Sequence, residues 1–222
     1  MTRQPIHEND GPEEIAFRRE AVVRLQDCAV VGEEWLLDHI LPEKIANWLV
    51  VVMAMTDRVP SAKVLPGNWI AVNANADQLT NRYFQPLWYS LARRCVQSGK
   101  QLVLEWTEYA PGDPSAALLL DSLKNEFGVQ ISIDDVGSPG ADGLWRMASV
   151  QVDWIKIDGA LFQRAARDSW VQDTLCGLIE AAKTRSIQTI IEWIETPEHL
   201  ALAKAMGATH GQGFFFSAQP KK

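Results

Sequence analysis

Short apolar runs that end in acidic or amide side chains recur along this chain, and helix-like segments separate most of them. In the stretch from Val129 to Asp158, one strand-like run stops at Asp134 and Asp135, and a second run carries Lys156. Two adjacent carboxylates need a cation or solvent nearby, so such a strand end is poorly suited to a core. Strands that alternate with helices and end in polar groups predict a parallel barrel whose chemistry gathers at its C-terminal mouth.

We therefore expect one α/β domain over residues 1–222, a modified TIM (β/α)8 barrel with an antiparallel first strand. The antiparallel pair follows from a strong turn signal at residues 9–12 between two strand-like runs. The expected strands are 4–6, 15–24, 69–73, 101–107, 129–135, 153–158, 187–192 and 211–216. The expected helices are 33–41, 43–55, 84–97, 115–127, 144–148, 171–184 and 200–206.

Composition and charge exclude several classes of function. The net charge is −7, which argues against a surface that binds duplex nucleic acid. The longest apolar run, Trp48–Met55, is too short to span a bilayer, and the N-terminus lacks the pattern of a signal peptide. Cys28, Cys95 and Cys176 lack CxxC spacing, and the histidines lack HExxH spacing, so we expect free thiols in a reducing cytoplasm and no zinc motif.

Several short motifs stand in a fixed order along the chain. They are Gln4-Pro5-Ile6, Glu20-Ala21-Val22-Val23-Arg24, Asn73, Glu105-Trp106-Thr107-Glu108, Asp134-Asp135-Val136-Gly137, Lys156-Ile157-Asp158, Glu192-Trp193-Ile194-Glu195 and Gln212-Gly213-Phe214. In order and spacing they are similar to the motifs of the EAL domain family, the cyclic di-GMP phosphodiesterase barrel. The family's opening motif, Glu-Ala-Leu-Val-Arg, falls on residues 20–24 in this comparison. The resemblance covers essentially the whole chain.

The resemblance implies that cyclic di-GMP is hydrolysed to linear pGpG at two divalent cations, Mg²⁺ or Mn²⁺, which lie about 3.5–4 Å apart in such sites. Hard cations of this kind prefer carboxylate and amide oxygens. The implied metal ligands are Glu20, Asn73, Glu105, Asp134, Asp135 and Glu192. The implied catalytic residues are Lys156, Glu192, Asp135 and Gln212, and the implied substrate-binding residues are Arg24, Gln4 and Gln212. Glu108 and Glu195 would stabilise the neighbouring loops. The resemblance also implies that the chain can form a homodimer.

Departures from the family pattern support a second interpretation. Val136 replaces a Phe, Pro139 stands where the loop usually carries smaller residues, and Trp193 replaces a Gly beside Glu192. The alternative is therefore a weak or inactive EAL-like domain that serves as a cyclic di-GMP receptor or as an adaptor for a protein partner.

Individual residues also have structural alternatives. Glu20 and Arg24 could form an ion pair on an exposed strand. Lys156 could serve only to neutralise neighbouring acids, and Asn73 and Gln212 could be ordinary turn residues. The tryptophans Trp106, Trp154 and Trp193 could stack on guanine bases, or they could pack in the barrel or in a dimer.

Overall fold

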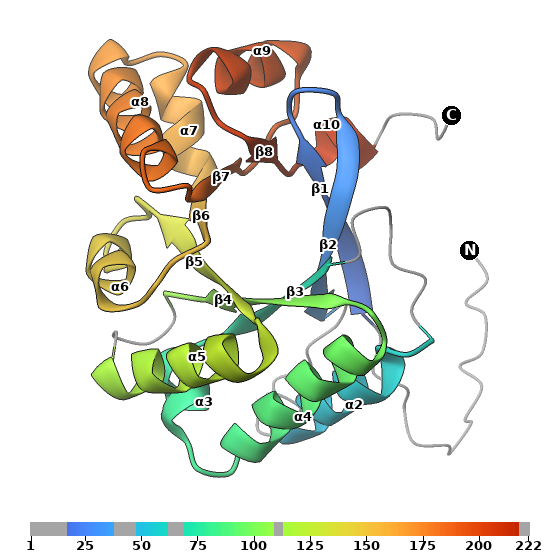
Figure 1. Cartoon of the computed structure of the whole chain (residues 1–222). Helices are drawn as coiled ribbons and strands as arrows, with labels where there is room; N and C mark the ends of the chain where they lie inside the picture. Colours follow the sequence, from blue (N-terminus) through green and yellow to red (C-terminus); the bar gives the residue numbers. More distant parts are fainter. Residues whose placement is uncertain (1–16, 38–47, 62–68, 109–112, 218–222) are drawn as a thin grey trace, which may run out of the picture.

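The computed structural model describes residues 17–37, 48–61, 69–108 and 113–217, which form a closed eight-stranded barrel with helices on its outside (Figure 1). The strands follow one another around the barrel in chain order, from β1 to β8. Strand β1 is antiparallel to both β2 and β8, and every other neighbouring pair is parallel. The prediction of a TIM-like barrel with an antiparallel first strand is confirmed.

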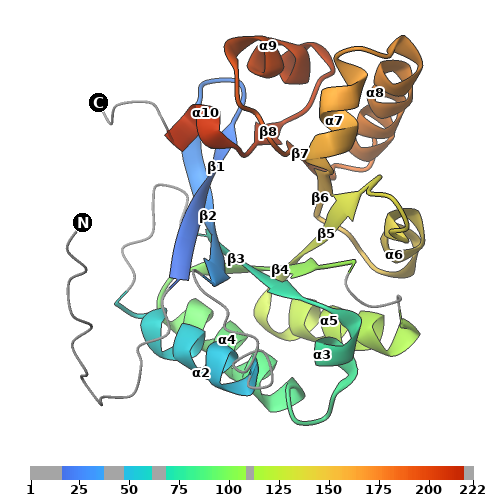
Figure 2. The same cartoon turned by 180° about the vertical axis from the view of Figure 1, so that it is seen from behind.

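Each strand is short, and most are followed by a helix. The strands are β1 (Phe17–Arg24), β2 (Ala29–Leu37), β3 (Trp69–Ala74), β4 (Gln101–Trp106), β5 (Gln130–Val136), β6 (Trp154–Ile157), β7 (Gln188–Ile191) and β8 (His210–Gly211). The helices are α2 (Trp48–Arg58), α3 (Ala76–Thr80), α4 (Gln85–Gln97), α5 (Pro114–Phe127), α6 (Gly143–Ser149), α7 (Gly159–Ala165), α8 (Ser169–Lys183), α9 (Pro197–Ala205) and α10 (Phe214–Ser217). Seen from behind, α4, α5 and α8 again lie outside the ring of strands (Figure 2). Within the described residues, no helix has the length and hydrophobicity that a membrane span requires.

The interior of the barrel is a packed core, as in other barrels of this type. The rings of Trp69 and Trp154 lie 5.3 Å apart between their centroids, and aliphatic side chains such as Val22 and Ile190 surround them. Gly32 makes room for this arrangement, because a Cβ there would lie 2.1 Å from the indole of Trp69. A filled interior leaves polar chemistry to the ends of the strands.

The predicted helix over residues 33–41 is wrong in its described part, because Ala29–Leu37 is strand β2. A tight turn returns the chain onto β1: Cys28 has a φ of 57°, and Asp27 Oδ1 accepts a hydrogen bond from the Ala29 amide at 3.2 Å. Antiparallel pairing then fixes β2 along the whole of β1. The predicted strand 4–6 lies outside the described residues, and the antiparallel partners of β1 are β2 and β8.

The last predicted strand, 211–216, is also wrong in extent. Strand β8 ends at Gly211, and α10 begins at Phe214. Gly213 has a φ of 143°, and a Cβ there would lie 2.3 Å from the carbonyl oxygen of Ile194, so the chain turns sharply against that segment. Helix α7 was not predicted. Its N-cap is Asp158, whose Oδ1 accepts a hydrogen bond from the Leu161 amide at 2.8 Å.

Candidate functional site

Lys156 lies at the centre of a buried group of carboxylates. Its Nζ is 2.9 Å from an oxygen of Glu105, of Asp134 and of Glu192, and 3.2 Å from an oxygen of Glu34. The Lys156 side chain is only 3% exposed. We call these five residues the acid cluster. One cation among four carboxylates leaves the acid cluster short of positive charge if all of them are ionised.

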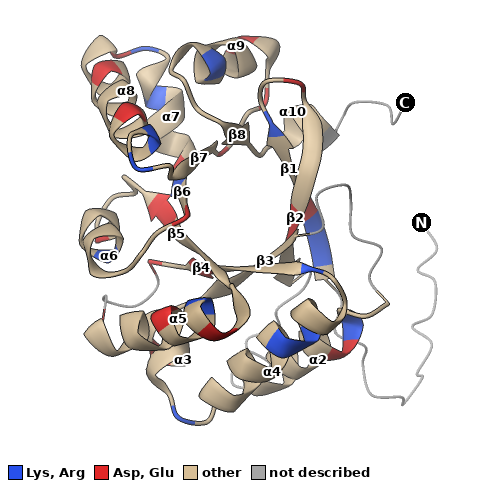
Figure 3. Ribbon diagram, viewed as in Figure 1, with Lys and Arg blue, Asp and Glu red and all other residues tan. Residues whose placement is uncertain are grey.

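The acid cluster is assembled from the ends of strands. Glu34 lies on β2, Glu105 on β4, Asp134 on β5 and Lys156 on β6, and Glu192 follows β7 directly. Because these strands are parallel, their C-terminal ends meet at one opening, which we call the mouth. Figure 3 shows acidic residues on β2 and β5 of the ring. Of the predicted site residues, the structure brings Glu105, Asp134 and Glu192 together around Lys156 at this rim.

Two amide side chains hold Glu34 in place. Asn73 Nδ2 donates a hydrogen bond to Glu34 Oε1 at 2.8 Å, and Gln212 Nε2 donates to Glu34 Oε2 at 3.0 Å. The carbonyl oxygens of both amides, Asn73 Oδ1 and Gln212 Oε1, are buried without a hydrogen-bond partner among the described residues. Both predicted amides therefore lie beside the acid cluster, with an acceptor left over.

Glu34, and not Glu20, is the glutamate that the structure brings into the acid cluster. The two residues are register partners on β1 and β2. The Glu20 carboxylate instead lies 2.8 Å from Arg18 Nη2, and its side chain is 39% exposed. The available signal was Glu34-Trp35-Leu36, which shares its first and third residues with the Glu-Ala-Leu motif. Counted from Glu34, the Arg position of that motif is Asp38, which lies outside the described residues.

Arg24 lies at the opposite end of the barrel from the acid cluster. It pairs in register with His210 and lines a cavity of about 490 Å³ that Gln188 also lines. Gln188 begins β7, whereas Glu192 follows its end, so this cavity is at the far opening. Arg24 Nη1 is 2.9 Å from Asp27 Oδ2, and Glu20 contacts Arg18, so the structure does not pair Glu20 with Arg24 as the alternative expected. The structure thus does not place Arg24 at the mouth, and Gln4 lies outside the described residues.

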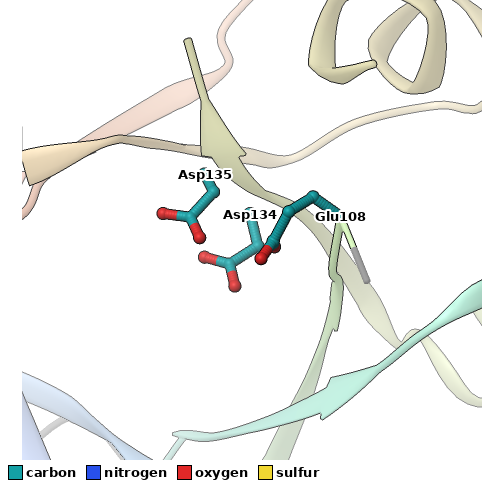
Figure 4. Close-up of side chains that lie close together, drawn as sticks. All are labelled: Glu108, Asp134 and Asp135. Atoms are coloured by element: carbon teal, nitrogen blue, oxygen red, sulfur yellow. The ribbon is translucent and has the colours of Figure 1, made fainter. Parts of the chain in front are cut away.

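Two further acids, Glu108 and Asp135, lie beside Asp134 of the acid cluster, whereas Glu195 does not. Carboxylate oxygens of Glu108, Asp134 and Asp135 all lie within 4.8 Å of one another (Figure 4). Asp135 has a φ of 50°, a backbone conformation that is uncommon for residues other than glycine. Glu195 points elsewhere: it is exposed, and its Oε2 accepts a hydrogen bond from Gln163 at 3.4 Å.

Arg146 is a residue of this region that the sequence did not reveal. It is fully buried, and its Nε donates to Asp142 Oδ1 at 2.7 Å. Its guanidinium also donates to the backbone carbonyls of Asp134, at 3.0 Å, and of Trp106. These carbonyls belong to β5 and β4, so Arg146 ties together the two strand ends that carry Asp134 and Glu105. An Arg in a short helix gives no local signal of such a role.

The positive charge of Lys156 and the surrounding acids stabilise each other. Burial disfavours the Lys156 ammonium, but the charges of Asp134, Glu105, Glu192 and Glu34 outweigh burial and raise its pKa well above the usual range. For Glu34, burial would raise the pKa, yet the charge of Lys156 and the hydrogen bonds from Gln212 and Asn73 lower it. Lys156 therefore stays protonated and Glu34 ionised.

Other acids of the site hold protons more tightly. Burial, together with the charge of Glu34, raises the pKa of Glu105 well above its usual range. Burial raises the pKa of Glu192 to about 8, although the charge of Lys156 opposes this. Burial and the charge of Asp134 raise the pKa of Asp135 to about 6. Such shifts are typical of carboxylates that share a site without enough positive charge.

The donor set fits divalent cations. Glu105 Oε1 is buried without a hydrogen-bond partner in the described part of the chain, as is Asn73 Oδ1. The triad of Glu108, Asp134 and Asp135 adds a second group of converging oxygens. Carboxylate and amide oxygens are the ligands that Mg²⁺ and Mn²⁺ prefer. The residues present therefore match a site for hard cations.

Comparison with known proteins identifies relatives of this chain. The EAL domain family model matches residues 34–219. One relative is the cyclic di-GMP phosphodiesterase PdeL of Escherichia coli (strain K12), 27% identical over 190 residues that cover 81% of this chain and 52% of PdeL. Another is the cyclic di-GMP phosphodiesterase TpdA of Vibrio parahaemolyticus, 27% identical over 214 residues that cover 96% of this chain and 36% of TpdA. The chain thus spans about half of PdeL and roughly a third of TpdA.

Solved structures share the fold. The PaMucR phosphodiesterase in complex with c-di-GMP has a TM-score of 0.73 and 21% identity, over 94% of this chain and 92% of that one. The manganese and cyclic di-GMP complex of Klebsiella pneumoniae BlrP1 has a TM-score of 0.72 and 20% identity, over 95% of this chain and 57% of that one. The family match begins at Glu34, in the acid cluster, and extends past Gln212, so this chain belongs to the EAL domain family.

Proposed function

We propose that this chain is a metal-dependent phosphodiesterase that hydrolyses cyclic di-GMP to linear pGpG. The observation that carries the proposal is the acid cluster itself, in which four carboxylates from different strands surround Lys156 at 2.9–3.2 Å. The names of PdeL, TpdA and PaMucR, which are phosphodiesterases, support the choice of reaction.

Two groups of residues would hold the cations, Mg²⁺ or Mn²⁺. The first group is Glu34, Asn73, Glu105 and Asp134, and the second is Asp134, Asp135 and Glu108, with Glu192 beside them. Bound cations of this kind supply a water of lowered pKa and neutralise the charge of the phosphate. Glu34 takes the role that the sequence comparison assigned to Glu20.

The remaining polar residues would act on protons and position. Glu192, whose carboxylate lies 2.9 Å from Lys156 Nζ, would accept a proton from an attacking water when it is ionised. Lys156 Nζ holds three carboxylate oxygens at 2.9 Å and presents positive charge to the same space. Gln212 orients Glu34 through its amide nitrogen. Arg24 and Glu195 lie outside this set.

The test is turnover of cyclic di-GMP by the purified chain with Mn²⁺ or Mg²⁺. We expect Glu34→Gln to lower kcat/KM at least about 100-fold, because a positioned charged group at a metal or transition state contributes about that much. Glu20→Gln is the matched control, since Glu20 lies opposite Glu34 on the neighbouring strand. We expect Glu20→Gln to stay within about threefold of the unsubstituted chain. Equal losses in both variants would contradict this assignment.

Two observations favour a second function, that of a cyclic di-GMP receptor or protein adaptor with little turnover. Trp193, beside Glu192, has a φ of 55° at a position where the family motif has Gly. Asp38 stands at the Arg position of the motif counted from Glu34, so a cation suited to a phosphate is replaced by an acid. Saturable binding of cyclic di-GMP without product, in the unsubstituted chain and in Glu34→Gln alike, would support the receptor.

The cellular setting is part of the proposal as well. Cys28, Cys95 and Cys176 are free thiols, which supports a reducing compartment, and we propose the cytoplasm. A homodimer and a protein partner remain predictions from the resemblance. Sedimentation of the purified chain with and without cyclic di-GMP tests the homodimer.

A further inference from the structure

We propose that Trp193 is a substrate-binding residue that stacks on a base of the nucleotide bound at the mouth. This inference rests on the proposed function, because it concerns the ligand of the same site. Among the three tryptophans that the sequence offers for base stacking, Trp106 is fully buried and Trp154 is 8% exposed inside the barrel. Trp193 is 50% exposed.

The backbone places Trp193 within the walls of the mouth. The preceding residue, Glu192, contacts Lys156 at 2.9 Å. The following residue, Ile194, donates its amide hydrogen to the carbonyl of Gln212 at 2.9 Å, and the Gln212 side chain contacts Glu34. Trp193 is therefore held on both sides by residues of the site, and it cannot move far without moving them.

The Trp193 indole lies against Gly159, and half of the residue surface is exposed. A Cβ added at Gly159 would lie 2.2 Å from Trp193 Cγ and 2.3 Å from its Cδ2, so the ring rests on the Gly159 backbone. Gly159 comes two residues after the end of β6, the strand that carries Lys156. The ring thus lies across the ends of β6 and β7, with half of the residue surface left open. A flat ring supported from behind is the arrangement that a stacked base needs.

The backbone conformation of Trp193 points to function rather than to packing. Its φ of 55° is in the left-handed region, which bulky residues rarely adopt and glycine adopts freely. Strain of this kind persists where the surrounding structure imposes it, often at ligand sites. Because half of its surface is exposed, Trp193 gains little stability from burial that could offset this strain. A base stacked on the exposed part of the indole would account for a tryptophan at this position.

The experiment measures two properties of the purified chain: the Kd of cyclic di-GMP with Mn²⁺ present, and the Mn²⁺ concentration that gives half of the metal-induced rise in Tm. The variants are Trp193→Phe, which keeps an aromatic face, and Trp193→Leu, which keeps apolar bulk without one. Trp170→Leu is the matched control, because Trp170 is 77% exposed at the start of α8.

We expect Trp193→Leu to weaken cyclic di-GMP binding at least about fivefold, the lower end for loss of a base–aromatic stack. Trp193→Phe and Trp170→Leu should stay within about threefold of the unsubstituted chain, and all variants should keep the same Mn²⁺ midpoint. Binding by Trp193→Leu as tight as that of the unsubstituted chain would overturn the inference. Tighter binding would also overturn it and would show that the Trp193 side chain obstructs the nucleotide site. If the unsubstituted chain responds to Mn²⁺ but binds no cyclic di-GMP, the proposed function fails and the stacking role fails with it.

Discussion

Gly159 and Trp193 share one space at the mouth of the barrel, since a Cβ on Gly159 would lie 2.2 Å from Trp193 Cγ. Gly159→Ala should therefore lower the free energy of unfolding by about 1–3 kcal/mol, the usual cost of overpacking. In a Trp193→Gly background the same substitution should cost less than about 0.5 kcal/mol, because the ring is gone and alanine favours helix α7. Urea unfolding of the four proteins gives the coupling energy. An equal cost in both backgrounds would contradict the contact.

Arg146 should be indispensable for the ends of β4 and β5. Arg146→Met leaves Asp142 without this guanidinium contact and the carbonyls of Asp134 and Trp106 without its hydrogen bonds, so we expect a loss of about 3–5 kcal/mol of unfolding free energy. Arg164→Met is the matched control, because Arg164 also pairs with an Asp four residues away but is 69% exposed. The control should change stability by less than about 0.5 kcal/mol. Similar losses in both variants would refute the supporting role of Arg146.

Lys156 should be required for folding as well as for chemistry. In Lys156→Met the surrounding acids lose their shared cation, which should cost about 3–5 kcal/mol at pH 8. The loss should shrink at pH 5, because Glu192, whose pKa is about 8, is protonated and neutral there. Lys183→Met, at a side chain that is 67% exposed, is the control and should show no such pH dependence. Denaturant unfolding at the two pH values measures the difference.

Divalent cations should stabilise the chain. At a Mn²⁺ concentration 100 times the Kd, mass action predicts a gain of about 2.7 kcal/mol, which excess chelator should reverse. Glu105→Gln removes a carboxylate with an unpartnered oxygen, so its gain at the same concentration should be smaller. Calorimetric scans with Mn²⁺ and with chelator provide the comparison. A rise in Tm that is the same in Glu105→Gln would place the cation elsewhere.

His210, at the far end of the barrel, should make stability depend on pH. Burial lowers its pKa from 6.5 to about 4, and the charge of Arg24 adds to this effect. The unfolded chain therefore takes up a proton near pH 6.5 while the folded chain stays neutral until about pH 4. Stability should fall by up to roughly 3 kcal/mol as the pH drops through this window.

The variant His210→Phe keeps an aromatic ring beside Trp154, whose ring lies 4.9 Å from that of His210, but it cannot titrate. Its unfolding free energy should fall less than that of the unsubstituted chain between pH 7 and pH 4. Parallel curves for the two proteins would show that His210 is not the group responsible. Urea unfolding across this pH range supplies both curves.

Local signals explain why β3 to β7 and the helices α4, α5, α6, α8 and α9 were predictable. Asp113 Oδ1 accepts a hydrogen bond from the Ser115 amide at 2.7 Å, Gly128 has a φ of 69°, and Thr196 Oγ1 accepts one from the His199 amide at 3.1 Å. Each of these residues is of a type that favours its capping position. The acids at the C-terminal ends of those strands could be placed once the strands were predicted.

The first two strands depend on pairing between segments, which residue type does not encode. Glu20 and Glu34 both begin plausible versions of the same motif. Only their contacts distinguish them, because Glu34 reaches Lys156 whereas Glu20 pairs with Arg18. The contacts of Arg146 are likewise long-range, since Trp106 is forty residues away in the chain. Periodicity could not reveal either relationship.

Strand β8 joins β1 through only two register pairs, Val23 with Gly211 and Arg24 with His210, whereas β3 pairs with β4 along its whole length. The barrel is therefore fastened weakly at this seam, as it is between β7 and β8, which also share two register pairs. The amides of Val23 and Gly211 should exchange with deuterium sooner than those of β3 and β4. Gln212, which reaches across to Glu34, follows directly after the seam. A ligand that strengthens the contact between Gln212 and Glu34 would therefore also stabilise the closure of the barrel between β8 and β1.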